Sequence, residues 1–161
     1  MIRPIKPEDA PLLLELFENM SRKSIYHRFF SPLKSLPLSM LVKFTQIDYD
    51  REVALVALEQ DQDKERLLAV ARAIRDPDQQ NAEFALAVGD LWHGKGLGTK
   101  ILQRCIEVAR EQGVKALYGR VLSENNEMLA LAEKLGFHLS RSREADEYVV
   151  TMDLTSNDSG A

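Results

Sequence analysis

An apolar run, a glycine-rich loop and an amphipathic segment follow one another between residues 81 and 110, and this order restricts the fold more than any other feature. The apolar run covers residues 84–88, and the loop covers residues 94–98 with the sequence GKGLG. After the loop, apolar residues recur at helical spacing, at positions 97, 101, 102, 105, 106 and 109. The pattern predicts a strand, a loop and a helix that begins beside the glycines.

Nucleotide-binding motifs of several kinds share this layout, and the glycine spacing separates them. Gly89, Gly94 and Lys95 match the P-loop, but Gly96 then stands where that motif needs a hydroxyl for magnesium. A dinucleotide fingerprint requires a further glycine where this chain has Thr99. What remains is a turn whose backbone N–H groups point into one concavity at a helix N-terminus and attract an anion, with a pyrophosphate as the expected ligand. The alternative is a loop that only turns the chain.

The loop resembles the signature of the GNAT superfamily of N-acetyltransferases, which is Gln or Arg, two residues, Gly, one residue, then Gly or Ala. This chain has His93, Gly96 and Gly98 at those positions, so the glycines fit and the histidine departs from the pattern. The resemblance implies that the loop binds the pyrophosphate of coenzyme A, with acetyl-CoA as the co-substrate and no metal. The residues implied in this binding are His93, Gly94, Lys95, Gly96, Leu97, Gly98 and Thr99.

Composition excludes several other classes of protein. The chain has 161 residues and a formal charge of -4, which predicts one domain, over residues 1–154, without a polycationic surface for nucleic acid. The longest apolar runs are far too short to span a bilayer and no leader is recognisable, so a cytoplasmic protein is expected. Cys105 is the single cysteine and lies on the apolar face of the predicted helix, which favours a buried small hydrophobe over a nucleophile.

The order of the remaining segments predicts an α/β (α+β) fold with a mixed, mostly antiparallel sheet and helices on both faces. Strands are expected at residues 2–5, 53–58, 67–74, 82–88, 115–122 and 147–154, with polar loops at 59–66 and 75–81. Helices are expected from residue 7, at 21–30 and 38–47, after the glycine loop, and at 127–135. Residues 155–161 look disordered. This arrangement resembles the GNAT fold across nearly the whole chain.

Transfer of an acetyl group to a lysine-like amine requires a base, because such an amine is mostly protonated at neutral pH. Glu83 begins the strand that leads into the glycine loop, and strand alternation places it on one face with two small alanines. A partly desolvated carboxylate at that position would have a raised pKa and could take a proton directly or through water. The alternative is a solvated carboxylate at a strand end; the resemblance favours the catalytic role. Asp48, Asp50 and Glu52 are the competing acids.

The resemblance also assigns roles around this strand and the last helix. The backbone of Leu86, Ala87 and Val88 would pair with the pantetheine arm and offer an N–H to the oxyanion. Asn125 would cap the last helix or touch the cofactor. Many relatives carry a tyrosine as general acid where this chain has Ala132, so the proton donor for the departing thiolate is not identified.

The N-terminal half is similar to the acetyltransferase domain of bacterial protein lysine acetyltransferases of the Pat type. The similarity rests on the segments PIKPED, SRKSIYHRFF and FTQIDYDREVALVA. It implies direct attack by a protein lysine in a ternary complex, with AMP-forming acyl-CoA synthetases as the expected partners. Tyr26 and Arg28 are the candidates for acceptor recognition, against packing and a surface ion pair. A small-molecule amine acetyltransferase and a non-catalytic acyl-CoA sensor stay open as alternatives.

Overall fold

The computed structural model describes residues 1–31, 33, 35–78, 80–142 and 146–155. Its seven strands form a single sheet in the order β1-β2-β3-β4-β5-β7-β6. The strands are β1 (Ile2–Pro4), β2 (Glu52–Asp61), β3 (Lys64–Arg75), β4 (Asn81–Val88), β5 (Ala116–Leu122), β6 (His138–Arg141) and β7 (Glu147–Asp153). The helices are η1 (Pro7–Asp9), α1 (Ala10–Glu18), α2 (Arg22–Phe29), α3 (Leu38–Thr45), η2 (Asp90–Trp92), α4 (Leu97–Glu111) and α5 (Asn126–Leu135).

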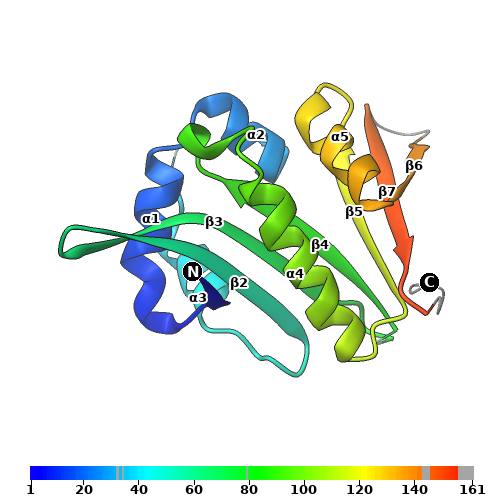
Figure 1. The fold of residues 1–161 in the computed structure, drawn as a ribbon, viewed down its shortest axis with the longest axis horizontal. Helices are drawn as coiled ribbons and strands as arrows, with labels where there is room; N and C mark the ends of the chain where they lie inside the picture. The colour runs from blue at the N-terminus through cyan, green and yellow to red at the C-terminus, as the bar shows by residue number, and fades with distance from the viewer. Residues whose placement is uncertain (32, 34, 79, 143–145, 156–161) are drawn as a thin grey trace.

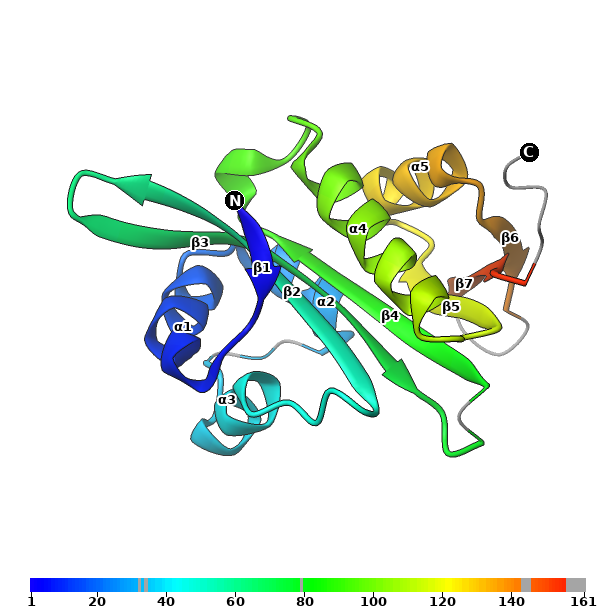
Figure 2. The same cartoon turned by 60° about the horizontal axis from the view of Figure 1, so that its bottom comes forward.

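The sheet lies between two layers of helices, with α1, α2 and α3 on one face and α4 and α5 on the other (Figures 1 and 2). Each face has its own hydrophobic cluster, because successive side chains of a strand point to opposite sides. Strands β4 and β5 are parallel, and the other neighbouring strands are antiparallel. The predicted mixed, mostly antiparallel sheet with helices on both faces is therefore confirmed.

The parallel pair in the middle of the sheet separates after three residue pairs. The ladder joins residues 81–83 of β4 to residues 116–118 of β5, and among the described residues β4 has no strand partner on that side beyond Glu83. The ring of Phe84 packs directly against Gly119 of β5, where an added Cβ would lie 2.5 Å from the ring. Its centroid is also 5.1 Å from that of Phe137. The two strands thus diverge toward the N-termini of α4 and α5 (Figure 1).

Three segments differ from the sequence prediction, and one of them is the short helix η2 between β4 and the glycine loop. Residues 59–66, expected to be a loop, extend β2 and β3 into a long hairpin that projects from the body of the protein (Figure 1). Its side chains are polar on both faces, so the hairpin carries no apolar alternation, and backbone pairing alone defines it. The short strand β6 was not predicted, and three of its four residues are polar or charged. Residues 156–161 of the predicted tail lie outside the described residues.

Within the part of the chain that the structure describes, no helix is both long enough and apolar enough to cross a bilayer.

Candidate active site

The glycine loop presents a row of free backbone amides. Gly94 and Gly96 have φ angles of 74° and 84°, which place them in the left-handed region that glycine adopts without strain. The first amide of α4 that bonds back to the chain belongs to Lys100, which donates to the carbonyl of Gly96. Among the described residues, the amides from Gly94 to Thr99 have no hydrogen-bond acceptor. Together with the helix dipole they form a site suited to a phosphate or diphosphate.

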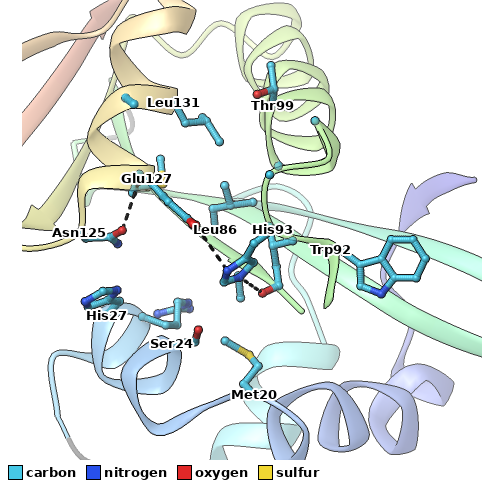
Figure 3. Close-up of a pocket in the computed structure, with 18 of the residues that line it drawn as sticks. Met20, Ser24, His27, Leu86, Trp92, His93, Thr99, Asn125, Glu127 and Leu131 are labelled. Carbon is cyan, nitrogen blue, oxygen red and sulfur yellow. Dashed lines mark hydrogen bonds and ion pairs between the residues drawn. The ribbon is translucent and has the colours of Figure 1, made fainter. Parts of the chain in front are cut away.

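These amides open onto a cavity of about 410 Å³ between α4, α5, α2 and the end of β4, which we call the loop cavity (Figure 3). A Cβ added to Gly98 would lie 3.1 Å from Leu131 of α5 and 3.3 Å from Val88 of β4, so glycine allows these three elements to approach closely. Most of the predicted cofactor residues line this cavity, namely Leu86, Ala87, Val88, His93, Gly94, Gly96, Gly98, Thr99 and Asn125.

Two predicted cofactor residues do not line the loop cavity. Leu97 packs against the hydrophobic cluster under α4. The ammonium of Lys95 lies 5.4 Å from the centre of the Trp92 ring, and Lys95 is not among the residues that line the cavity. Lys134 of α5, which sequence reasoning missed, does line the cavity. Lys134 therefore adds a positive charge to the α5 wall of the loop cavity.

The last residues of β4 turn an open backbone edge toward the gap beside β5. The N–H of Gly89 donates to the carbonyl of Leu68 on β3, so strand alternation directs the peptide groups of Leu86 and Val88 away from β3 and toward the gap beside β5.

His93 contacts the end of this strand: its Nε2 lies 2.8 Å from the carbonyl oxygen of Val88, a contact in which the nitrogen must donate. On the other side of the ring, Nδ1 lies 3.4 Å from Glu127 of α5, so His93 connects the loop to α5 across the cavity (Figure 3).

A second cavity, of about 190 Å³, lies where β4 and β5 diverge, and we call it the Glu83 cavity. Glu83 lines it, and its carboxylate oxygen lies 3.5 Å from Nε of Arg120 on β5. The two side chains are 40% and 54% exposed, so the predicted base is accessible and held by a partly solvated ion pair. The loop cavity and the Glu83 cavity share five lining residues, which are His27, Arg28, Leu86, Asn125 and Met128. The two cavities therefore adjoin each other; we call them together the cleft, and we call the five shared residues its junction.

The start of α5 contributes Asn125 to this junction. Its side-chain oxygen accepts the N–H of Met128 at 3.2 Å, which is the N-cap geometry. Asn125 thus caps the helix and also lines both cavities. Ala132, which stands where many relatives carry a tyrosine, is fully buried in the core. No proton donor reaches the cleft from that position.

Helix α2 forms the opposite wall of the junction. Arg28 lines both cavities, whereas Tyr26 is 37% exposed and lines neither of them. Desolvation and then the neighbouring Arg72 lower the pKa of Arg28 to about 10, so the guanidinium is still charged at neutral pH.

His27, which sequence reasoning missed, also lines both cavities, and its Nε2 lies 3.1 Å from the carboxylate of Glu124. Ser24, His27 and Arg28 are spaced three and four positions apart, so a helix places them on one face, and this spacing is the sequence feature that could have identified this wall of the cleft.

The competing acids lie elsewhere. Asp48 lines a separate open hollow between α3 and the start of the chain, and neither Asp50 nor Glu52 lines either part of the cleft. Cys105 is fully buried, and burial raises the pKa of its thiol to about 12, so it packs as a small hydrophobe as expected. Among the described residues there is no group of three or more side chains arranged to hold a metal.

Comparison with known proteins places this cleft in a family context. Residues 22–137 match the model of the acetyltransferase (GNAT) family. An acetyltransferase of Pseudomonas aeruginosa is 27% identical over 137 residues, which cover 85% of this chain and 74% of the relative. Acetyltransferase Pat of Mycolicibacterium smegmatis is 30% identical over 137 residues, but this chain spans only 40% of its length. The crystal structure of the GNAT domain of S. lividans PAT superposes with a TM-score of 0.87 and 29% identity, covering 94% of this chain and 89% of that one.

Proposed function

The chain belongs to the acetyltransferase (GNAT) family, and from this we propose that it transfers the acetyl group of acetyl-CoA to lysine side chains of proteins. It is an N-acetyltransferase that uses acetyl-CoA, and it is similar in type to the Pat acetyltransferases. AMP-forming acyl-CoA synthetases are the acceptors that we propose to test first. The reaction that we propose is direct attack of the amine on the thioester in a ternary complex.

The observation that supports this proposal most is that the two cavities adjoin each other. The free amides of residues 94–99 face one end of the cleft, and the Glu83 carboxylate faces the other. A diphosphate on the amides would direct the rest of the cofactor along the open edge of β4, where Leu86 and Val88 offer peptide groups as a neighbouring strand would. The thioester would then lie at the junction, within reach of an amine that enters through the Glu83 cavity.

The residues around the junction suit each step of acetyl transfer. Glu83 would accept the proton of the attacking amine as the C–N bond forms, and the N–H of Leu86 would stabilise the oxyanion. As the C–S bond breaks, the thiolate would take a proton. Among the five side chains shared by the two cavities, that of His27 is an imidazole, which can donate a proton as well as accept one, and its Nε2 lies 3.1 Å from the carboxylate of Glu124. We assign His27 the role of proton donor that the buried Ala132 leaves vacant.

A protein acceptor is supported by the similarity to Pat acetyltransferases rather than by the cleft alone. The N-terminal segments that carry the family resemblance include the whole of α2, and α2 forms a wall of the Glu83 cavity. Because this chain spans less than half of the mycobacterial relative, the targets and partner domains of the longer protein are proposals for this chain.

The test is a mass-spectrometric comparison of an AMP-forming acyl-CoA synthetase before and after incubation with this protein and acetyl-CoA. Acetylation of an active-site lysine, dependent on the protein, is the expected result. If labelled acetyl groups from acetyl-CoA enter only small amines of a lysate, the enzyme is a small-molecule acetyltransferase. If acetyl-CoA binds and no acceptor is acetylated, the sensor alternative is correct and the catalytic proposal is wrong.

A further inference from the structure

Arg28 is a charged side chain at the junction that has no partner within the described part of the chain. It makes no ion pair or hydrogen bond there, and its guanidinium carbon lies 4.7 Å from the Phe29 ring centroid and 5.7 Å from that of Phe44. The two ring centroids are only 6.3 Å apart, so both rings lie toward the same side of the guanidinium, and the N–H groups along the rest of its edge are left for another group. Because the side chain lines both cavities, that edge is accessible from the cleft.

A second guanidinium lies behind the first. Arg72 of β3 is 2% exposed, its Nη2 donates to the carbonyl of Phe44 at 3.2 Å, and its carbon lies 4.5 Å from the Phe44 ring centroid. Its Nη1 is buried and has no hydrogen-bond partner in the part of the chain that the structure describes. Phe44 therefore contacts one arginine that lines the cleft and another that is buried in the core, and the charge of Arg72 acts on Arg28.

The nearby carboxylates do not neutralise this pair at close range. Glu83 attracts Arg28, but its carboxylate contacts Arg120 at 3.5 Å. Glu52 attracts Arg72 from the other side, where it shares no ion-pair contact with it among the described residues. The junction thus carries an excess of positive charge in a desolvated place, and an anion with two oxygens would satisfy both the charge and the free N–H groups.

Building on the proposed function, we propose that Arg28 binds a carboxylate that the acceptor carries close to the amine that is acetylated. The Glu83 cavity has the size of one amino acid, and it places the base and Arg28 on walls of the same space. An acceptor that contacts both would direct its amine to Glu83 and its carboxylate to Arg28. The carboxylate has two possible sources, the α-carboxylate of a free amino acid or an acidic side chain beside the target lysine in a protein.

A different role for Arg28 makes a different prediction. If the guanidinium polarised the thioester carbonyl instead, its loss would slow acetylation of every acceptor by the same factor, with or without a carboxylate. The ratio of rates for acceptors that differ only in that group separates the two roles. Since the ratio is measured within one enzyme preparation, it does not depend on how much of a variant is folded.

The experiment uses two sets of matched acceptors, with release of coenzyme A as the readout. One set pairs common L-amino acids with their carboxamides, and the other pairs lysine peptides that carry Asp or Asn beside the lysine. We expect kcat/KM to favour the carboxylate member of one set by roughly tenfold to a hundredfold, mainly through KM. A carboxamide has the less basic amine, so a preference for the acid cannot come from a larger fraction of free amine.

Variants complete the test. Arg28→Gln should reduce the preference to within about twofold while calorimetry shows unchanged coenzyme A binding, and Arg28→Lys should keep part of it. Arg104→Gln, on the exposed face of α4, is the matched control and should keep the full preference. Equal rates on both members of every pair, or an equal loss on both in Arg28→Gln, would overturn the Arg28 proposal and leave the acetyltransferase standing. Turnover of free amino acids alone would support the carboxylate site and refute the protein acceptor, and absence of any turnover would refute both.

Discussion

Replacement of Glu83 by glutamine tests the assignment of the base with little disturbance of the fold. Glutamine has the same shape and keeps an oxygen that can face Arg120, but it cannot take a proton at neutral pH. The ion pair that is lost is partly solvated, with side chains 40% and 54% exposed, and such pairs stabilise proteins by about 0–1 kcal/mol. Glu83→Gln should therefore change the free energy of unfolding by less than about 1 kcal/mol.

The expected effect on catalysis is much larger than the effect on stability. Positioned general bases contribute roughly 10²-fold to 10⁴-fold to a rate, so kcat for an acceptor peptide should fall by about that factor. The loop cavity lies at the other end of the cleft, and the dissociation constant of coenzyme A should stay within about twofold of the native value. Coenzyme A release in a thiol assay gives kcat, calorimetry gives the dissociation constant, and urea unfolding gives the stability.

Arg120→Gln is the matched control, because it removes the same ion pair and keeps the carboxylate. Its kcat should stay within several-fold of the native value. If Glu83→Gln keeps its kcat across neutral pH, Glu83 is not the base, whatever its position in the cleft. If both variants lose activity equally, the ion pair rather than the carboxylate is what the reaction needs.

The structure supports three further predictions. Gly98→Val should raise the dissociation constant of coenzyme A, measured by calorimetry, at least several-fold. Even a Cβ at this position would lie 3.1 Å from a leucine of α5, and the larger side chain would fill the approach to the free amides. Unchanged binding would mean that the cofactor binds elsewhere. Gly119→Ala should lower the free energy of unfolding by about 1–3 kcal/mol in urea titrations, because its Cβ would lie 2.5 Å from the Phe84 ring; a neutral result would mean that the strands move apart freely. The hydrogen bonds from Arg3 lower the pKa of Asp9, so the ionised carboxylate stabilises the fold above about pH 4. This stabilisation is lost as the pH falls through the lowered pKa. Asp9→Asn should therefore have a lower free energy of unfolding than the native chain at neutral pH, and urea titrations in acid should show a smaller difference.

The strand, the glycine loop and the helix after it could be predicted because each depends on local chemistry. Glycine permits left-handed φ angles at positions 94 and 96 whatever surrounds it, and a helix N-terminus has free amides in any fold. The hairpin between β2 and β3 could not be predicted in the same way. Its tip exposes polar residues on both faces, so the two strands are specified by pairing with each other rather than by burial.

The candidate site was anticipated in part, mainly through the family resemblance. That resemblance singled out the edge of β4 and Asn125, and the structure shows Asn125 as the N-cap of α5. His27 and Glu124 are 97 positions apart and meet only because the fold brings α2 beside the segment that follows β5, which no local pattern reveals. The expected contact between His93 and a phosphate is still a prediction, since in the structure its ring bonds to the end of β4 and to α5.

Helical geometry separates the two acceptor candidates, Tyr26 and Arg28. Residues two apart on an α-helix point about 200° away from each other, so these two side chains cannot both face the same cavity of a narrow cleft. Ser24, His27 and Arg28 lie on one face of α2, and this face lines the cleft. A contact between Tyr26 and the acceptor therefore requires an acceptor large enough to extend around α2 onto the outer surface, as a folded protein does and a free amino acid does not. Replacement of Tyr26 by alanine should for that reason weaken acetylation of a protein acceptor and leave acetylation of free amino acids unchanged.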